Sequence, residues 1–284
     1  MNASHPTVLT TPDGTRIAYH DRRPTPEPTH SLLLLHGLAG HQGEWDVLAS
    51  RLTAEGRRVV TYDARGHGES TRVPAATSRD AHVRDAVALI ETLFLAPVTL
   101  VGQSLGGHTA MLLAAAHPRL VKSLVLVEAG PAGPSPDLPD RIAGWLDSWP
   151  TPFQSLEQAR EFLGHEAWTR ALEEGPDGWY PRCDRDVMIA SVAELATTAY
   201  WTQWSRITCP TLLLQGENGT MRPGEPEQML TLRPHARREV VPDAGHDVHL
   251  DQPDRLYEVI RTFLADDGTL THQDETPTHQ GAGR

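Results

Sequence analysis

The chain has 284 residues, of which 39% are apolar, so it is long enough for one large α/β domain or two small ones with a sizeable core. A net charge of −12 argues against nucleic-acid or anionic-membrane partners and weakly against anionic substrates. Two cysteines, Cys183 and Cys209, are too few for a disulfide framework, so we expect a cytoplasmic protein. The polar residues 1–11 do not resemble a signal peptide, and no apolar run approaches the roughly 20 residues of a membrane span.

Short apolar runs alternate with helical patterns along the first 130 residues, which predicts a mostly parallel sheet covered by helices on both faces. The expected strands are Thr15–His20, Ser31–Leu35, Arg58–Tyr62, Val98–Val101 and Val121–Val127. The expected helices between them are Trp45–Leu52, Asp80–Leu95 and Leu105–Ala116.

The pattern then breaks at a proline-rich segment that carries six of the chain's seven tryptophans and helical pieces such as Pro139–Trp149 and Asp186–Thr198. We interpret residues 131–205 as a helical lid inserted into a core domain made of residues 1–130 and 206–265. The second core part is expected to hold strands Thr211–Gln215 and Glu239–Val241 and helices Glu225–Leu232 and Arg255–Leu264. Residues 266–284 are polar, which predicts a disordered tail.

A G-x-S-x-G pattern, Gly102-Gln103-Ser104-Leu105-Gly106, lies between an apolar strand and an alanine-rich helix. Glycines at these positions let the backbone make the sharp turn that exposes a serine, and the helix N-terminus adds N–H donors. An ordinary tight turn with a buried serine would not explain why strand, turn and helix coincide. We therefore predict that Ser104 is a nucleophile.

An earlier strand ends in Leu35-His36-Gly37-Leu38, which indicates an oxyanion hole. The tetrahedral intermediate of acyl transfer needs two preorganised donors, and we expect them to be the backbone N–H groups of Leu38 and Leu105. His36 is more typical of a structural hydrogen-bonding residue than of a proton carrier.

The general base that a serine hydroxyl needs is predicted in Ala244-Gly245-His246-Asp247, after the last strand. His246 lies in a predicted loop. The order of the residues along the chain, with the serine first and the histidine last, also suits this chemistry. The run His246, Asp247, His249 and Asp251 superficially suggests a metal site, but no further ligand cluster with suitable spacing accompanies it, so we expect no metal.

These segments, together with Asp63-Ala64-Arg65-Gly66-His67-Gly68-Glu69-Ser70, resemble the α/β-hydrolase superfamily over about residues 8–265. The resemblance implies the α/β-hydrolase fold, an eight-stranded, mostly parallel sheet with a lid inserted after the sixth strand. It also implies a structural rather than catalytic role for Asp63.

The acid of the triad departs from the common pattern of this superfamily. Many members carry Asp three residues after the glycine that closes the seventh strand, and here that position is Gly219. Two carboxylates are candidates instead: Glu128, directly after the sixth strand, and Glu217. At Glu128 the sequence resembles zearalenone-type lactonases and some haloalkane dehalogenases, so we favour Glu128 as the acid. The alternatives are that Glu217 is the acid, that neither residue is, and that Glu128 is only a solvated cap at the entry to the lid.

A serine at the nucleophile position argues against dehalogenases and epoxide hydrolases of this superfamily, which carry Asp there. We expect a serine hydrolase that cleaves a small-molecule carboxylic ester or lactone through an acyl-enzyme, with no cofactor and no nucleic-acid or membrane partner. Two alternatives stay open: a ligand-binding protein with a hydrolase fold, and a cofactor-free haloperoxidase with the same Ser and His.

Overall fold

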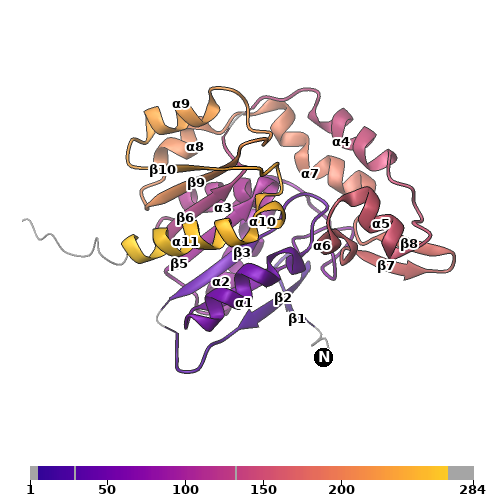
Figure 1. Cartoon of the computed structure of the whole chain (residues 1–284), viewed down its shortest axis with the longest axis horizontal. Coiled ribbons are helices and arrows are strands. Elements are labelled where there is room, and N and C mark those ends of the chain that lie inside the picture. The colour runs from indigo at the N-terminus through magenta and orange to yellow at the C-terminus, as the bar shows by residue number, and fades with distance from the viewer. Residues whose placement is uncertain (1–5, 29, 132, 268–284) are drawn as a thin grey trace, which may run out of the picture.

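A mixed eight-stranded sheet forms the centre of the chain, in the strand order β1-β2-β4-β3-β5-β6-β9-β10. The computed structural model describes residues 6–28, 30–131 and 133–267 (Figure 1). The strands are β1 (Thr7–Thr10), β2 (Arg16–Arg22), β3 (Ser31–Leu35), β4 (Arg58–Tyr62), β5 (Val98–Gln103), β6 (Val121–Val127), β9 (Thr211–Gly216) and β10 (Arg237–Val241). Only β1 and β2 pair antiparallel to their neighbours, and the other strands are parallel. The predicted α/β-hydrolase fold is confirmed.

Helices cover both faces of this sheet, and each face has its own apolar core (Figure 1). In β3, Leu33 and Leu35 pack in one core while Leu32 and Leu34 pack in the other, as expected for a strand buried on both faces. The helices of the core are η1 (Gln42–Trp45), α1 (Asp46–Ala54), α2 (Arg79–Thr92), α3 (Ser104–Ala116), α9 (Glu225–Leu232), α10 (Val248–Asp251) and α11 (Pro253–Asp267). None of the described helices is both long enough and apolar enough to cross a membrane.

The chain between β6 and β9 forms a series of short elements, most of which lie beside the sheet (Figure 1), whereas its last helix packs on the core through Trp204. It comprises α4 (Leu138–Asp147), α5 (Leu156–Leu163), α6 (Glu166–Thr169), β7 (Leu172–Gly175), β8 (Gly178–Pro181), α7 (Arg185–Thr197) and α8 (Trp201–Arg206). Trp149, Phe153 and Trp168 belong to a third apolar cluster, which also contains Ala39 of the core. This cluster joins the insertion to the end of the sheet.

Three sequence predictions differ from the structure in detail. The insertion contains the β7–β8 hairpin, turned by Gly175-Pro176-Asp177-Gly178, where a wholly helical lid was expected. The edge strand β1 was not predicted, because its short, mostly exposed sequence lacks an apolar pattern. Helix α11 extends to Asp267, so the first two residues of the predicted tail are helical. Residues 268–284 of that tail lie outside the described residues.

Candidate active site

Ser104 lies at the sharp turn between β5 and α3, with a positive φ of 49°. A side chain at Gly106 would overlap the backbone of Leu35 and His36, so the turn approaches β3 closely only because this residue is glycine. The strained backbone holds Ser104 at the carboxyl edge of the sheet, where it lines a cleft. The predicted nucleophile is therefore accessible rather than buried within the turn.

The two predicted oxyanion donors come from different segments of the chain. Leu38 lies in the loop after β3, and Leu105 lies in the first turn of α3, where backbone N–H groups have no partner within the helix. Both residues line the cleft that contains Ser104. Their two N–H groups are therefore candidates to bind one developing oxyanion.

Two buried histidines hold the loop that carries Leu38. His36 accepts a hydrogen bond from Ala64 N at 3.0 Å and pairs through its other ring nitrogen with Gly37 O at 2.7 Å. His67 accepts from Ala39 N at 3.0 Å. Burial lowers the pKa of His36 to about 4 and that of His67 to about 3, so both rings are neutral acceptors near pH 7. These contacts agree with the structural interpretation of His36.

His246 follows β10 in a loop that is fixed from three directions. Gln103, next to the nucleophile, donates to His246 O at 3.2 Å. Asp251 accepts from Gly245 N at 2.7 Å, and Trp168 of the insertion donates to Asp247 at 3.3 Å. The imidazole remains 36% exposed and lines the same cleft as Ser104.

Glu128 comes directly after β6 and has a positive φ of 49°, an uncommon conformation for a residue with a side chain. Its side chain is fully buried, which contradicts a solvated cap. The carboxylate accepts from Gly216 N at 2.9 Å and from Thr220 N at 2.7 Å, and Oε2 lies 3.5 Å from Nδ1 of His246. The buried charge is thus held by backbone donors beside the imidazole.

Gly219 explains how a carboxylate from the sixth strand reaches this place. A Cβ added to Gly219 would overlap the carboxylate of Glu128, so the glycine leaves the space that Glu128 fills. Glu217, the other candidate, accepts from Asp243 N at 3.1 Å and is exposed. The geometry therefore brings Glu128, and not Glu217, to His246.

The cleft over Ser104 and His246 has a volume of about 550 Å³. Its apolar wall is supplied mostly by the insertion, through Leu138, Ile142, Trp145, Trp168, Val192 and Leu195. A second cleft of about 670 Å³ lies beside the β7–β8 hairpin and contains none of the predicted site residues. The apolar wall from the insertion suits an apolar substrate group, while the rest of the lining is polar or charged.

The acidic and histidine residues that follow His246 point to different partners. Asp251 pairs with His165 at 2.9 Å, and His249 pairs with the buried Glu44 at 3.1 Å. Within residues 6–28, 30–131 and 133–267, no group of three or more His, Cys, Asp or Glu residues is arranged to hold a metal ion.

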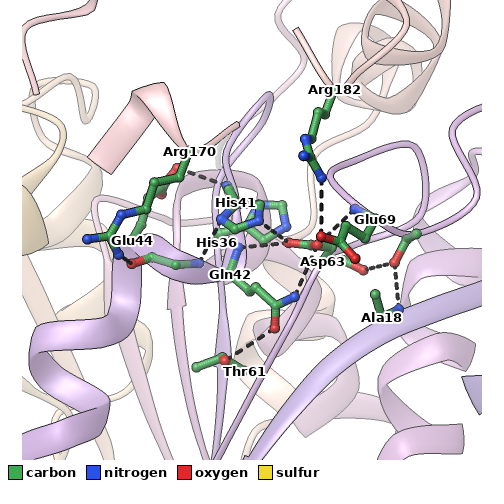
Figure 2. Close-up of polar contacts among 12 residues, drawn as sticks. Ala18, His36, His41, Gln42, Glu44, Thr61, Asp63, Glu69, Arg170 and Arg182 are labelled. Atoms are coloured by element: carbon green, nitrogen blue, oxygen red, sulfur yellow. Dashed lines mark hydrogen bonds and ion pairs between the residues drawn. The ribbon is translucent and has the colours of Figure 1, made fainter. Parts of the chain in front are cut away.

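Asp63, at the end of β4, organises the loops beneath the site (Figure 2). Its buried carboxylate accepts from Gln42 N at 2.8 Å, from the Gln42 side chain at 3.1 Å and from Glu69 N at 3.0 Å. Figure 2 also shows Arg182, from the insertion, which donates to Glu69 at 3.2 Å. Asp63 therefore acts on the loops after β3 and β4 rather than on a substrate.

Asp63→Asn is expected to lower the free energy of unfolding by about 3 kcal/mol, because an amide cannot accept all three hydrogen bonds and would turn an N–H group toward buried donors. Urea unfolding measures this loss. Asp80→Asn is the matched control, since Asp80 is exposed and pairs only with Arg84 one turn away on α2. Equal, small losses in both variants would contradict the structural role of Asp63.

Comparison with known proteins agrees with this fold. A family model described as the alpha/beta hydrolase family matches residues 32–259. An sn-1-specific diacylglycerol lipase of Mus musculus is 32% identical over 257 residues, which cover 83% of this chain and 81% of the lipase. Two solved structures share the fold. E-2-(acetamidomethylene)succinate hydrolase has a TM-score of 0.81 and 21% identity, and the match covers 92% of this chain and 100% of that chain. The enol-lactonase of Burkholderia xenovorans LB400 has a TM-score of 0.75 and 20% identity, and the match covers 91% of this chain and 100% of that chain.

Three features of the site were not predicted from the sequence. Thr220 contacts both Glu128 and His246, whereas Trp168 and His165 link the insertion to the loop of His246. The only available signal for Thr220 was its position next to Gly219. No sequence pattern marks the other two, because their contacts cross about 80 residues of chain.

Proposed function

The chain belongs to the alpha/beta hydrolase family, and we propose that it is a serine hydrolase that cleaves carboxylic esters or lactones through an acyl-enzyme, with Ser104, His246 and Glu128 as its triad. The observation that carries this proposal is the convergence of Ser104 and His246 in one cleft, with the buried carboxylate of Glu128 beside the imidazole.

The mechanism follows from the position of each group. His246 removes the proton of Ser104 as Oγ attacks the substrate carbonyl, and Glu128 stabilises the imidazolium that forms. The N–H groups of Leu38 and Leu105 bind the oxyanion of the tetrahedral intermediate. His246 then protonates the leaving alcohol, and water, activated by the same imidazole, releases the acyl group. No step needs a cofactor.

The insertion, residues 131–205, is proposed to act as the lid of this cleft. Leu138, Ile142 and Trp145 of α4 line the space above Ser104, which supports an ester with an apolar acyl or alcohol group. The similar mouse lipase acts on diacylglycerol by its name, which agrees with an apolar acyl group. The placement of Ser104 and His246 in one cleft, with Glu128 beside the imidazole, supports turnover rather than ligand binding alone. The cysteine content supports a cytoplasmic location.

A panel of p-nitrophenyl esters of increasing acyl length, with simple and aromatic lactones, tests the activity. At least one class is expected to be hydrolysed, and longer acyl chains should lower KM because they bury more apolar area in the cleft. A fluorophosphonate should label the protein once, at Ser104, as peptide mapping will show. A protein that is neither labelled nor active on any member of the panel would contradict the proposed function.

A further inference from the structure

We propose that Thr220 is a positioning residue whose hydroxyl holds the imidazole of His246 while its backbone N–H holds the carboxylate of Glu128. This inference rests on the proposed function and adds a fourth side chain to the hydrolytic site. Thr220 Oγ1 lies 2.8 Å from His246 Nδ1, within the usual range of a hydrogen bond. Glu128 Oε2 lies 3.5 Å from the same nitrogen, which is too far for a good direct hydrogen bond.

The chemistry of the base decides the direction of these hydrogen bonds. A general base must keep Nε2 unprotonated to accept the serine proton, so Nδ1 of His246 carries the hydrogen and donates it to Thr220 Oγ1. The hydroxyl hydrogen of Thr220 faces Glu128 Oε2, but Oγ1 lies 3.5 Å from it, as far as Nδ1 does, so this contact is weak and the hydroxyl acts mainly as the acceptor for His246. The opposite direction would put a hydrogen on Nε2 and leave no acceptor for Ser104.

Thr220 also fixes the carboxylate through its backbone. Its N–H donates to Glu128 Oε2 at 2.7 Å, while Gly216 N holds Oε1 at 2.9 Å. The same residue therefore orients both the acid and the base. This arrangement compensates for an acid that arrives from the end of β6 and stops short of Nδ1. When the imidazolium forms, its N–H donates more strongly, and the hydroxyl between the two charges helps to stabilise it.

The cleft around this connection is lined by six charged side chains and by His108; the charged residues are Glu44, Glu128, Arg141, Arg222, Glu225 and Asp247. Glu128 approaches from β6, and Asp247 follows His246 in the chain and is held by Gln103 and Trp168. Arg222 bonds to Pro134 O and the Ser135 side chain, and Glu225 of α9 lines the same cleft. Of these groups Glu128 is the one that Thr220 contacts, and a side-chain substitution keeps the backbone N–H that holds its carboxylate. A change in the acidic limb of kcat/KM in such a variant therefore reports on the lost hydroxyl.

Thr220→Val keeps the shape and removes the hydroxyl, and it is compared with Thr220→Ser, which restores the hydroxyl. We expect Thr220→Val to lower kcat about 10- to 100-fold with KM within about twofold, and Thr220→Ser to stay within about threefold of the wild type. The apparent pKa on the acidic limb of kcat/KM should fall in Thr220→Val, because the imidazolium loses an acceptor, and should return in Thr220→Ser. Thr231→Val is the matched control, since the Thr231 hydroxyl bonds only within α9.

Thr220→Ala supplies a second variant without the hydroxyl should valine disturb the loop, with circular dichroism and Tm as folding checks. The role of Thr220 would be overturned by a variant without the hydroxyl that folds, is labelled by the fluorophosphonate and keeps the kcat and the acidic limb of the wild type. That result would leave the proposed function standing. A Thr220→Val variant that is less stable but keeps the wild-type apparent pKa on the acidic limb of kcat/KM would also overturn the inference. Failure of the proposed function is distinct, because the wild type itself would then be neither labelled nor active.

Discussion

Ser104→Ala is expected to lower kcat/KM for the preferred ester by about 10⁴- to 10⁶-fold while the fold stays intact. The substitution removes the only oxygen of the turn that can form the acyl-enzyme, but it leaves the predicted oxyanion donors and the cleft in place. The residual rate should therefore exceed that of the reaction in water. Alanine has a side chain no larger than serine, so the strained turn between β5 and α3 has no new clash to accommodate.

The comparison requires initial rates on one ester and circular dichroism of both proteins. Ser205→Ala is the control, because Ser205 is exposed on α8 and its hydroxyl bonds only to Thr202 O. Fluorophosphonate labelling should disappear in Ser104→Ala and persist in Ser205→Ala. Activity within tenfold of the wild type in Ser104→Ala would contradict the assignment of the nucleophile.

The central strands of the fold could be predicted almost to the residue. Ser31–Leu35, Arg58–Tyr62 and Val121–Val127 match β3, β4 and β6, because each contains a short apolar stretch typical of a strand in a sheet that is covered on both faces. The hairpin of β7 and β8 could not be predicted in the same way. Its four-residue strands pair with each other, and among their side chains only that of Leu172 is buried.

The candidate site could be predicted where a motif fixes the local backbone. Ser104 is marked by the glycines of its turn, and His246 by its loop after the last strand. Thr220 could not be found in this way, because its contacts depend on the distance between the ends of β6 and β9. The contact of Trp168 with Asp247 likewise depends on how the insertion packs on the core.

Glu128→Gln is expected to lower kcat by about 10²- to 10⁴-fold, because the amide keeps the size of the side chain but loses the charge that stabilises the imidazolium. Glu217→Gln is the matched control, with an expected change within about threefold, since the Glu217 carboxylate accepts from Asp243 N instead. Both variants are measured on the same ester. A large loss of kcat in Glu217→Gln, together with a nearly unchanged kcat in Glu128→Gln, would place the acid after β9.

The space shared by Glu128 and Gly219 allows a stricter test, in which the acid is moved from one strand to the other. Gly219→Asp alone should be poorly active and less stable, because its new side chain overlaps the Glu128 carboxylate and adds a second buried charge. In Glu128→Ala with Gly219→Asp the space is vacated, and Gly219 has no positive φ that would disfavour an ordinary residue.

We therefore expect the double variant to be at least about tenfold more active than Glu128→Ala, although each single change is harmful. Such opposite effects in single and double variants are the signature of two residues that occupy one place. The double variant carries its carboxylate on a shorter side chain, which starts where the Glu128 carboxylate lies in the wild type. A double variant that folds but is no more active than Glu128→Ala would show that the carboxylate must come from β6.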